Sequence, residues 1–422
     1  MIKMKDSGIE WVHNIPSHWE VIKGKYIFTN RKDIVGARVD DYERLALTLN
    51  GVIKRSKDDN EGLQPERFDT YQILRKDELV FKLIDLKNIS TSRVGLSPYE
   101  GIVSSAYIVL TAGEKIYPSY AEKYYLMMWM HQVFNALGDS GVRSSLNVGD
   151  LLNILVPLPP FQEQIKIAEF LDKKVEEIDY TIELLKKQIT ELKILKSSLI
   201  YEKVTKGIDT KIPMKDSGIE WVHNIPSHWE VIKGKYIFTN RKDIVGARVD
   251  DYERLALTLN GVIKRSKDDN EGLQPERFDT YQILRKDELV FKLIDLKNIS
   301  TSRVGLSPYE GIVSSAYIVL TAGEKIYPSY AEKYYLMMWM HQVFNALGDS
   351  GVRSSLNVGD LLNILVPLPP FQEQIKIAEF LDKKVEEIDA LINDKFLQVE
   401  NLQSYKSNII YEYITGKKEV ES

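Results

Sequence analysis

The chain has 422 residues, of which 44% are apolar and 28% are charged, and this balance is typical of a folded protein with several domains. It contains no cysteine, which excludes disulfides, thiolate metal sites and cysteine nucleophiles and fits a reducing cytosol. The formal net charge of −5 argues against a simple polybasic nucleic-acid binder, so any basic face must arise from segregated charges.

The amino terminus is followed by no apolar run that would mark a signal peptide. No stretch of the chain approaches the ~20 consecutive apolar residues of a membrane span. We therefore expect a cytoplasmic protein that is neither exported nor embedded in a membrane.

The dominant feature of the chain is an internal repeat. Residues 4–179 recur without one substitution as residues 214–389, a duplication of 176 residues at an offset of 210. A unit of this size can bury its own core, so the repeat predicts two autonomous modules and not a solenoid. After Asp179 and Asp389 the copies diverge in sequence but keep a common helical pattern. Both recombination and deliberate construction would produce such a duplication.

Each copy begins with an irregular segment, residues 7–20, whose two tryptophans and proline predict an ordered arm. Alternation and β-branched residues then predict strands at 44–49, 78–84 and 102–112. Turn-forming residues separate these strands, and they cluster at Asn50-Gly51, at 57–62 and at 97–101.

A helix is predicted over 119–137, with Ser119 as its cap and Gly138 at its end. Its apolar face is assigned to the core and consists of Ala121, Tyr124, Tyr125, Met128, Trp129, Val133 and Phe134. The polar loop 138–147 carries one arginine among serines and glycines, which suits contact with a phosphate but also describes an ordinary connector. The apolar stretch 151–156 runs into Pro157-Leu158-Pro159-Pro160, which ends the module.

A long helix is predicted from Phe161, because apolar residues follow at alternating spacings of four and three. In the first copy this seam is Leu171, Val175, Ile178, Ile182, Leu185, Ile189, Leu192, Lys196 and Leu199. In the second copy it is Leu381, Val385, Ile388, Ile392, Lys395, Val399, Leu402, Lys406 and Ile409. A helix with one apolar stripe must bury that stripe, so we expect the two helices to pair, in the antiparallel sense.

These elements predict an α+β fold with two mixed α/β domains separated by two long helices that form an antiparallel coiled coil. The predicted divisions are globular domains at 1–160 and 214–370, spacer helices at 161–206 and 371–416, a linker at 207–213 and a tail at 417–422. Catalytic and cofactor motifs are missing from the sequence: it has no Walker loop, no Gly-x-Gly-x-x-Gly and no His-Glu-x-x-His. Leu158-Pro159-Pro160-Phe161 lacks the hydrogen-bond acceptor with which amino-methyltransferases hold a flipped base.

Short motifs recur in order in both copies. Ser7-Gly8-Ile9-Glu10-Trp11 and Ile15-Pro16-Ser17-His18-Trp19-Glu20 precede each module, and Pro157-Leu158-Pro159-Pro160 with Glu163-Gln164 and Ile167 leads each helix. With these motifs the layout resembles the specificity (S) subunit of type I restriction-modification systems over nearly the whole chain.

The resemblance implies that each module is a target-recognition domain that reads one half of a bipartite site in double-stranded DNA. It further implies a non-catalytic subunit on which two methyltransferase (M) subunits dock, with two restriction (R) subunits joining where DNA is cut. S-adenosylmethionine, ATP and magnesium would belong to those partners, and this chain would hold no cofactor or metal of its own. Members of this family usually carry two different recognition domains, whereas identical domains related by an approximate two-fold axis must read an inverted repeat.

Candidate DNA contacts are chosen from charge and loop position, not carried over from a family motif. In the two copies they are Arg31, Lys32, Lys54, Arg55, Lys57, Arg67, Arg93, Arg143, Arg241, Lys242, Lys264, Arg265, Lys267, Arg277, Arg303 and Arg353. Three other interpretations stay open: a tandem binding or adaptor protein with two identical ligand-binding heads on a coiled-coil spacer, a hydrolase or transferase, and a purely structural adaptor. A steep fall of affinity with salt would favour DNA as the ligand.

Overall fold

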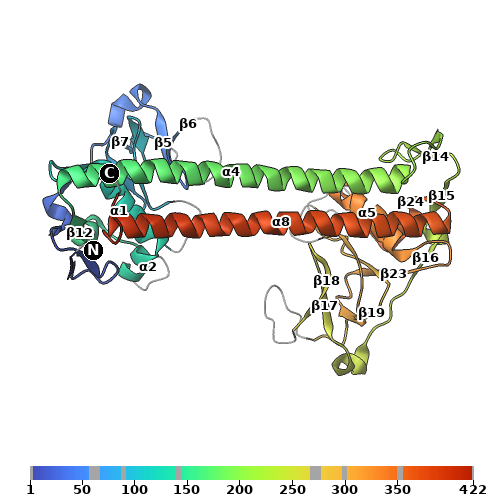
Figure 1. Ribbon diagram of the computed structural model, residues 1–422. Coiled ribbons are helices and arrows are strands. Elements are labelled where there is room, and N and C mark those ends of the chain that lie inside the picture. The colour runs from blue at the N-terminus through green and yellow to red at the C-terminus, as the bar shows by residue number, and fades with distance from the viewer. Residues whose placement is uncertain are drawn as a thin grey trace. The chain divides into compact units, whose positions relative to one another are not determined.

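The computed structural model describes residues 3–56, 67–86, 92–138, 144–266, 277–296, 302–348 and 355–420 (Figure 1). The chain divides into two compact units, of which the first is Met1–Lys186 with Leu397–Ser422 and the second is Lys187–Phe396. Each unit therefore contains one globular domain, the N-terminal half of that domain's own long helix, and the C-terminal half of the long helix from the other repeat. Within the described ranges, no helix combines the length and the apolar character that crossing a membrane requires.

The first domain consists of short strands and short helices that precede the long helix α4. In chain order these elements are β1 (Met4–Asp6), β2 (Asn14–Pro16), β3 (Glu20–Lys23), η1 (Gly24–Tyr26), β4 (Phe28–Asn30), η2 (Gly36–Asp41), β5 (Arg44–Thr48), β6 (Gly51–Arg55), β7 (Gln72–Leu74), β8 (Leu79–Phe81), β9 (Val94–Leu96), β10 (Gly101–Val103), β11 (Ile108–Ala112), α1 (Pro118–Met130), α2 (Val133–Leu137), α3 (Val148–Asn153), β12 (Leu155–Leu158) and α4 (Phe161–Lys206).

The second domain repeats this order before the long helix α8. Its elements are β13 (Met214–Asp216), β14 (Asn224–Pro226), β15 (Glu230–Lys233), η3 (Gly234–Tyr236), β16 (Phe238–Asn240), η4 (Gly246–Asp251), β17 (Arg254–Thr258), β18 (Gly261–Arg265), β19 (Gln282–Leu284), β20 (Leu289–Phe291), β21 (Val304–Leu306), β22 (Gly311–Val313), β23 (Ile318–Ala322), α5 (Pro328–Met340), α6 (Val343–Leu347), α7 (Val358–Asn363), β24 (Leu365–Leu368) and α8 (Phe371–Ile414).

Two four-stranded sheets form the body of each domain. In the first domain their strand orders are β6-β5-β10-β7 and β4-β11-β8-β9, and only the β5–β10 pair is parallel. The arm pairs β1 with β2 and then β3 with β12, so it returns to the residues just before α4. Trp19 in this arm is buried, and its indole Nε1 donates to Glu163 Oε1 of α4 at 2.9 Å. The predicted arm is therefore ordered, and the mixed α+β class is confirmed.

Three predictions of local structure are wrong in detail. The predicted helix 119–137 is interrupted, because Gln132 adopts a left-handed conformation (φ 57°) between α1 and α2 and lets Phe134 turn back into the core. Pro118 begins α1, so Ser119 does not cap it. The predicted strand 102–112 is two strands, β10 and β11, because its two ends belong to different sheets.

Two further parts of the sequence prediction can be compared with the structure. The helix α3, capped by Asn147, occupies the start of the apolar stretch 151–156. The apolar face predicted for 119–137 is confirmed, since all its members are buried except the partly buried Trp129.

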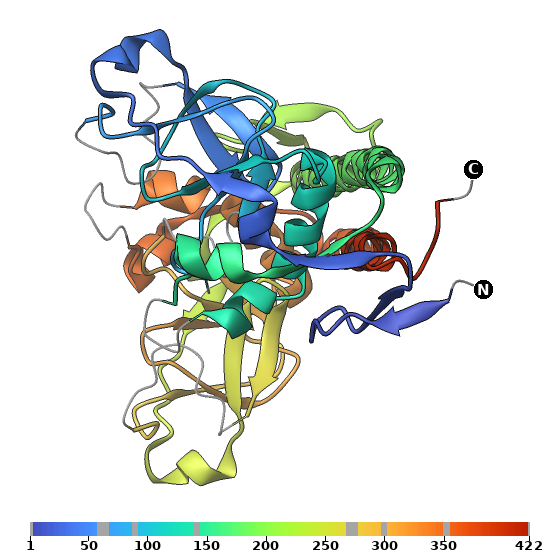
Figure 2. The ribbon, with the colours of Figure 1, turned by 90° about the vertical axis from the view of Figure 1, so that its left-hand side faces the viewer.

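Within each unit the two half-helices pack antiparallel, as the seam predicts (Figures 1 and 2). In the first unit Lys406 Nζ donates to both oxygens of Asp179, at 2.7 and 2.6 Å. In the second unit Lys196 Nζ makes the equivalent bonds to Asp389, at 2.8 and 2.6 Å. The lysines that interrupt the apolar seams at 196 and 406 are thus paired with acids on the facing helix, and such pairs specify the register of a coiled coil.

The diverged ends of the two helices keep some of the residues that touch the globular domains, since Ser407 Oγ lies 3.2 Å from His131 Nε2 and Ser197 Oγ lies 3.1 Å from His341 Nε2. Tyr120 Oη donates to Ile414 O at 3.3 Å in the first unit, and Tyr330 Oη donates to Val204 O at 3.2 Å in the second. The side chains that keep their identity between 180–206 and 390–416 include Lys196/Lys406, Ser197/Ser407, Ile200/Ile410, Tyr201/Tyr411, Glu202/Glu412 and Thr205/Thr415. Conserved contact positions therefore let either helix end fit the same domain.

Buried tyrosines make the stability of each unit sensitive to alkaline pH. Tyr120, Tyr124 and Tyr125 are fully buried on α1, and burial raises the pKa of each phenol well above its ordinary value. Since these groups ionise in the unfolded chain near pH ~10 but not in the folded one, stability is full below that pH and falls as pH rises, by ~1.4 kcal/mol per pH unit for each tyrosine. Urea unfolding between pH 8 and 11 measures this slope.

The variant Tyr125→Phe with Tyr335→Phe tests that expectation. These two hydroxyls are buried and have no hydrogen-bond partner among the described residues. Removing them should stabilise each unit by roughly 1 kcal/mol at neutral pH and reduce the alkaline slope. Tyrosinate absorbance that appears before unfolding in the wild-type chain would contradict this account.

Candidate nucleic-acid interface

The hairpin β5–β6 brings two predicted DNA contacts, Lys54 and Arg55, into one surface hollow. Two residues, Leu49 and Asn50, connect Thr48 to Gly51, and Gly51 has the positive φ of 87° that this tight turn requires. The hollow has a volume of about 450 Å³ and is lined by Asp40, Asp41, Tyr42, Glu43, Arg44, Lys54, Arg55 and Ser56. Lys54 and Arg55 thus line the same hollow as the carboxylates of Asp40, Asp41 and Glu43.

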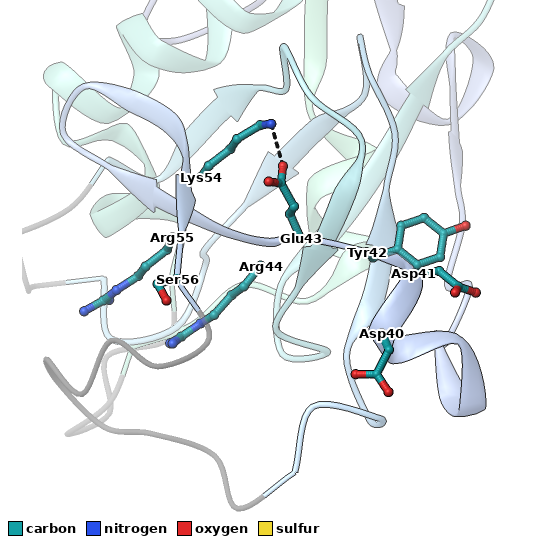
Figure 3. A pocket seen from close by; sticks show the side chains of 8 residues that line it. All are labelled: Asp40, Asp41, Tyr42, Glu43, Arg44, Lys54, Arg55 and Ser56. Atoms are coloured by element: carbon teal, nitrogen blue, oxygen red, sulfur yellow. Dashed lines mark ion pairs between the residues drawn. The ribbon is translucent and has the colours of Figure 1, made fainter.

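Figure 3 shows how these side chains lie. The Lys54 amino group points at the Glu43 carboxylate, with Nζ 2.5 Å from Oε2, while Arg44 and Arg55 extend together to one side. The hydrogen bond to Glu43, and then its charge, raise the pKa of Lys54. The Tyr99 ring lies 5.2 Å from the same Nζ. In the second unit Lys264 repeats the ion pair with Glu253 at 2.6 Å.

Other predicted cations are also held by acids of their own domain. Arg31 Nη2 lies 3.6 Å from Glu78 Oε1, and the equivalent Arg241 Nη2 lies 3.0 Å from Glu288 Oε1. The buried Glu78 carboxylate is anchored by Thr111 Oγ1 at 2.7 Å and by the amide of Arg75 at 2.8 Å. Arg67, whose side chain is 77% exposed, pairs with Asp69 two residues away, and Arg277 repeats this pair with Asp279.

Lys32 and Lys242 differ from these paired cations. Both are exposed, and neither has a partner among the residues that the structure describes. Lys242 lies at a second hollow of about 250 Å³, which is also lined by Asn240, Tyr317 and Asn357. These lysines are therefore the predicted contacts most ready to accept a phosphate.

The prediction that Arg93 is a surface contact is wrong. Arg93 is 1% exposed, as is Arg303 in the second copy. Its guanidinium donates to the carbonyl oxygens of Ile84, at 3.3 Å, and of Asp85. A third carbonyl, that of Lys82, lies at 3.5 Å. The side chain supplies donors to main-chain carbonyls after β8, and its burial argues against a direct contact of Arg93 or Arg303 with DNA.

Four predicted residues, Lys57, Arg143, Lys267 and Arg353, lie outside the described residues. The sequence prediction missed the acids of the interface, above all Glu43. The hairpin register pairs Arg44 with Arg55, so Glu43 and Lys54 are diagonal neighbours across two strands. The turn at Asn50-Gly51 was a signal for this hairpin, and a strand predicted at 51–55 would have located Glu43.

Most of the predicted cations that the structure describes are paired with acids, so their charges are largely neutralised within each domain. Arginines and lysines can bind phosphodiesters, and carboxylates can accept from a cytosine amino group, but each paired cation must first leave its acid. Within the described part of the chain, no cluster of three or more histidine, aspartate or glutamate side chains could hold a metal ion. The described side chains can therefore supply both cationic donors and carboxylate acceptors to a polar ligand.

Comparison with known proteins assigns the family. Residues 18–193 and 228–401 each match the family described as the type I restriction modification DNA specificity domain. The chain belongs to this family, that of the DNA specificity subunits of type I restriction-modification systems.

Two relatives come from Methanocaldococcus jannaschii. A putative type I restriction enzyme MjaX specificity subunit is 24% identical over 97% of this chain and 96% of its own length. The type I restriction enzyme MjaVIII specificity subunit is 28% identical over 64% of this chain, which spans only 63% of that relative.

A solved structure supports the fold. It concerns complex assembly and conformational transition of the type I R-M system, and one of its chains is similar to this one with a TM-score of 0.66 at 14% identity. The match covers 96% of this chain and 99% of the other. At this identity the likeness establishes two mixed domains with long helices and nothing finer.

Proposed function

We propose that this chain directs type I methyltransferase and restriction subunits to a bipartite DNA target that is an inverted repeat. One observation carries the proposal: the two recognition domains have identical sequences, and within each unit the domain's own helix packs antiparallel with the helix end of the other repeat. Identical surfaces read identical half-sites, and the antiparallel helices favour opposite directions of reading. The target is then a half-site, an unspecified spacer and the reverse complement of the half-site.

The chain acts in this proposal as a non-catalytic, cytoplasmic scaffold. Two M subunits dock on it, together with two R subunits where the system has them, and these partners supply S-adenosylmethionine, ATP and magnesium. Support comes from the family of the chain and from the side chains that line the hollow, which offer cations and acids for binding.

Co-expression with the neighbouring M subunit, followed by sequencing of modified bases across the genome, tests the function. We expect methylation at a bipartite palindromic motif. A motif whose halves differ would disprove the inverted repeat but keep the specificity role. Unmodified DNA in the presence of a stable complex would favour the tandem-binder alternative, and so would an affinity for DNA that does not fall with salt.

Glu43 and Glu253 should limit binding to non-cognate DNA, because each carboxylate forms an ion pair with a lysine that would otherwise contact a phosphate. In the variant Glu43→Gln with Glu253→Gln, we expect affinity for non-cognate DNA to rise roughly two- to fivefold and to depend more steeply on salt. Binding of cognate and random duplexes at several salt concentrations measures both effects. The control Glu114→Gln with Glu324→Gln makes the same change in net charge at exposed sites, and an equal gain there would contradict the specific role of Glu43.

A further inference from the structure

A buried lysine joins each globular domain to its long helix. Lys123 of α1 is 6% exposed, and its Nζ lies 2.8 Å from Glu122 Oε2 and 2.6 Å from Asp172 Oδ1 of α4. Ser119 Oγ donates to the other oxygen of Asp172 at 2.8 Å. The second unit repeats the cluster with Lys333, Glu332, Asp382 and Ser329, at 3.0, 2.7 and 3.1 Å.

The cluster reaches from the helix into the sheet. The second oxygen of Glu122 accepts from the amide of Leu96, on edge strand β9, at 3.1 Å. A continuous polar path therefore runs from β9 through α1 to α4. Every member of this path has a hydrogen-bonded or charged partner. The position of the domain on its helix therefore depends on the lengths and directions of these polar contacts as well as on apolar packing.

A buried lysine is not the most stabilising way to attach a domain to a helix, because its charge must be removed from water. Burial by itself lowers the pKa of Lys123, but the charges of Glu122 and Asp172 outweigh it and leave the pKa raised, so the ammonium stays charged. Apolar side chains of similar size would give equal or greater stability, whereas a buried ion pair tolerates little change in geometry. The apolar contacts of α1 already supply the adhesion, since Tyr120 and Tyr124 are fully buried beside the cluster.

Small rotations of a recognition domain matter for a bipartite site. Successive base pairs of B-DNA lie ~3.4 Å apart along the axis and about 10 of them complete a turn, so a spacer one base pair longer or shorter both displaces and rotates the second half-site. A domain held only by apolar packing against its helix would accept several spacers. A domain held by directional ionic contacts would accept few.

We propose that Lys123, Glu122 and Asp172, with Lys333, Glu332 and Asp382, are positioning residues that fix the angle between each recognition domain and its helix, and so restrict the spacer length of the DNA target. This inference rests on the proposed function. In this proposal the cluster affects DNA specificity without contacting DNA itself.

The test uses the full chain with its M subunit on a DNA library in which the two half-sites are separated by spacers of different lengths. The wild-type complex should methylate one spacer length strongly. The variant Asp172→Asn with Asp382→Asn removes one of the two anions around each lysine. We expect it to lose roughly three- to tenfold in rate at the preferred spacer and to gain methylation at a neighbouring length.

A matched control lies on the same helix. Glu177 pairs with Lys174 at 2.8 Å on the exposed side of α4, and Glu387 repeats this pair with Lys384 at 2.7 Å. The variant Glu177→Gln with Glu387→Gln makes the same change in charge without touching a domain, and it should keep the wild-type spacer profile. A milder variant, Ser119→Ala with Ser329→Ala, removes only the hydrogen bonds to Asp172 and Asp382 and decides the question if the asparagine variant does not fold.

The possible outcomes distinguish the positioning role of the cluster from the proposed specificity function of the chain. A folded variant with the wild-type spacer profile would overturn the positioning role and leave the specificity function intact. A wild-type complex that methylates no bipartite site would remove the function and this inference together. A broadened profile in the cluster variant, with none in the Glu177 control, is the result that supports it.

Discussion

A chain with Arg93→Met and Arg303→Met should lose roughly 2–4 kcal/mol of unfolding free energy in each unit. Each of these arginines is 1% exposed, and its guanidinium donates to main-chain carbonyls after β8 or β20, including those of Ile84 and Asp85 in the first copy. Methionine fills much of the same volume but offers no donor, so these buried carbonyls lose their charged partner. Urea unfolding followed by circular dichroism measures the loss.

The matched control is Arg67→Met with Arg277→Met, since these side chains are 77% and 78% exposed and pair with nearby aspartates. This control should unfold like the wild-type chain, and if Arg67 contacts phosphates it should bind all DNA sequences less tightly. The opposite pattern, an unchanged midpoint for the Arg93 variant with weaker DNA binding, would restore Arg93 as a surface contact.

The error about Arg93 has a physical cause. An arginine beside Ser90-Thr91-Ser92 suggests a phosphate contact, because the sequence shows the charge and the hydroxyl groups. It does not show which main-chain carbonyls will lack a hydrogen-bond donor in the folded domain. Which carbonyls need a donor depends on how β8 and β9 pair and on where the chain goes after Phe81. Burial of a charged side chain is a tertiary property, and local pattern did not predict it.

Other features were predictable because the sequence encodes them locally. The spacing of Leu171, Val175 and Ile178 marks one face of a helix wherever that helix lies, and these residues are buried or partly buried in the seam. By contrast, residues 102–112 look like one strand, but the two ends join different sheets. The composition of each unit, which takes its last helix from the other repeat, required contacts more than 200 residues apart, such as that between Lys406 and Asp179.

A chain containing only the first repeat and its helix, residues 1–210, should form a dimer. Each domain buries Ile410 and Ile414, or Ile200 and Val204, from a helix end that belongs to the other repeat. A single repeat cannot fold that end back onto its own domain, because α4 is a continuous helix from Phe161 to Lys206. A second copy of the shortened chain can supply the missing helix end. Two chains should therefore associate into a dimer in which each domain packs against the helix end of its partner.

Sedimentation equilibrium measures this change, and the seam provides its control. Two copies of α4 packed antiparallel place Asp179 of each copy against Lys196 of the other, as Asp179 faces Lys406 in the full chain. Asp179→Lys would set two cations together at both ends and should weaken the dimer, whereas Asp179→Lys with Lys196→Asp restores opposite charges and should restore it. A folded monomer that keeps α4 helical would show that the domains do not need the exchanged helix end. A dimer that ignores the charge exchange would show that the apolar seam alone specifies the register.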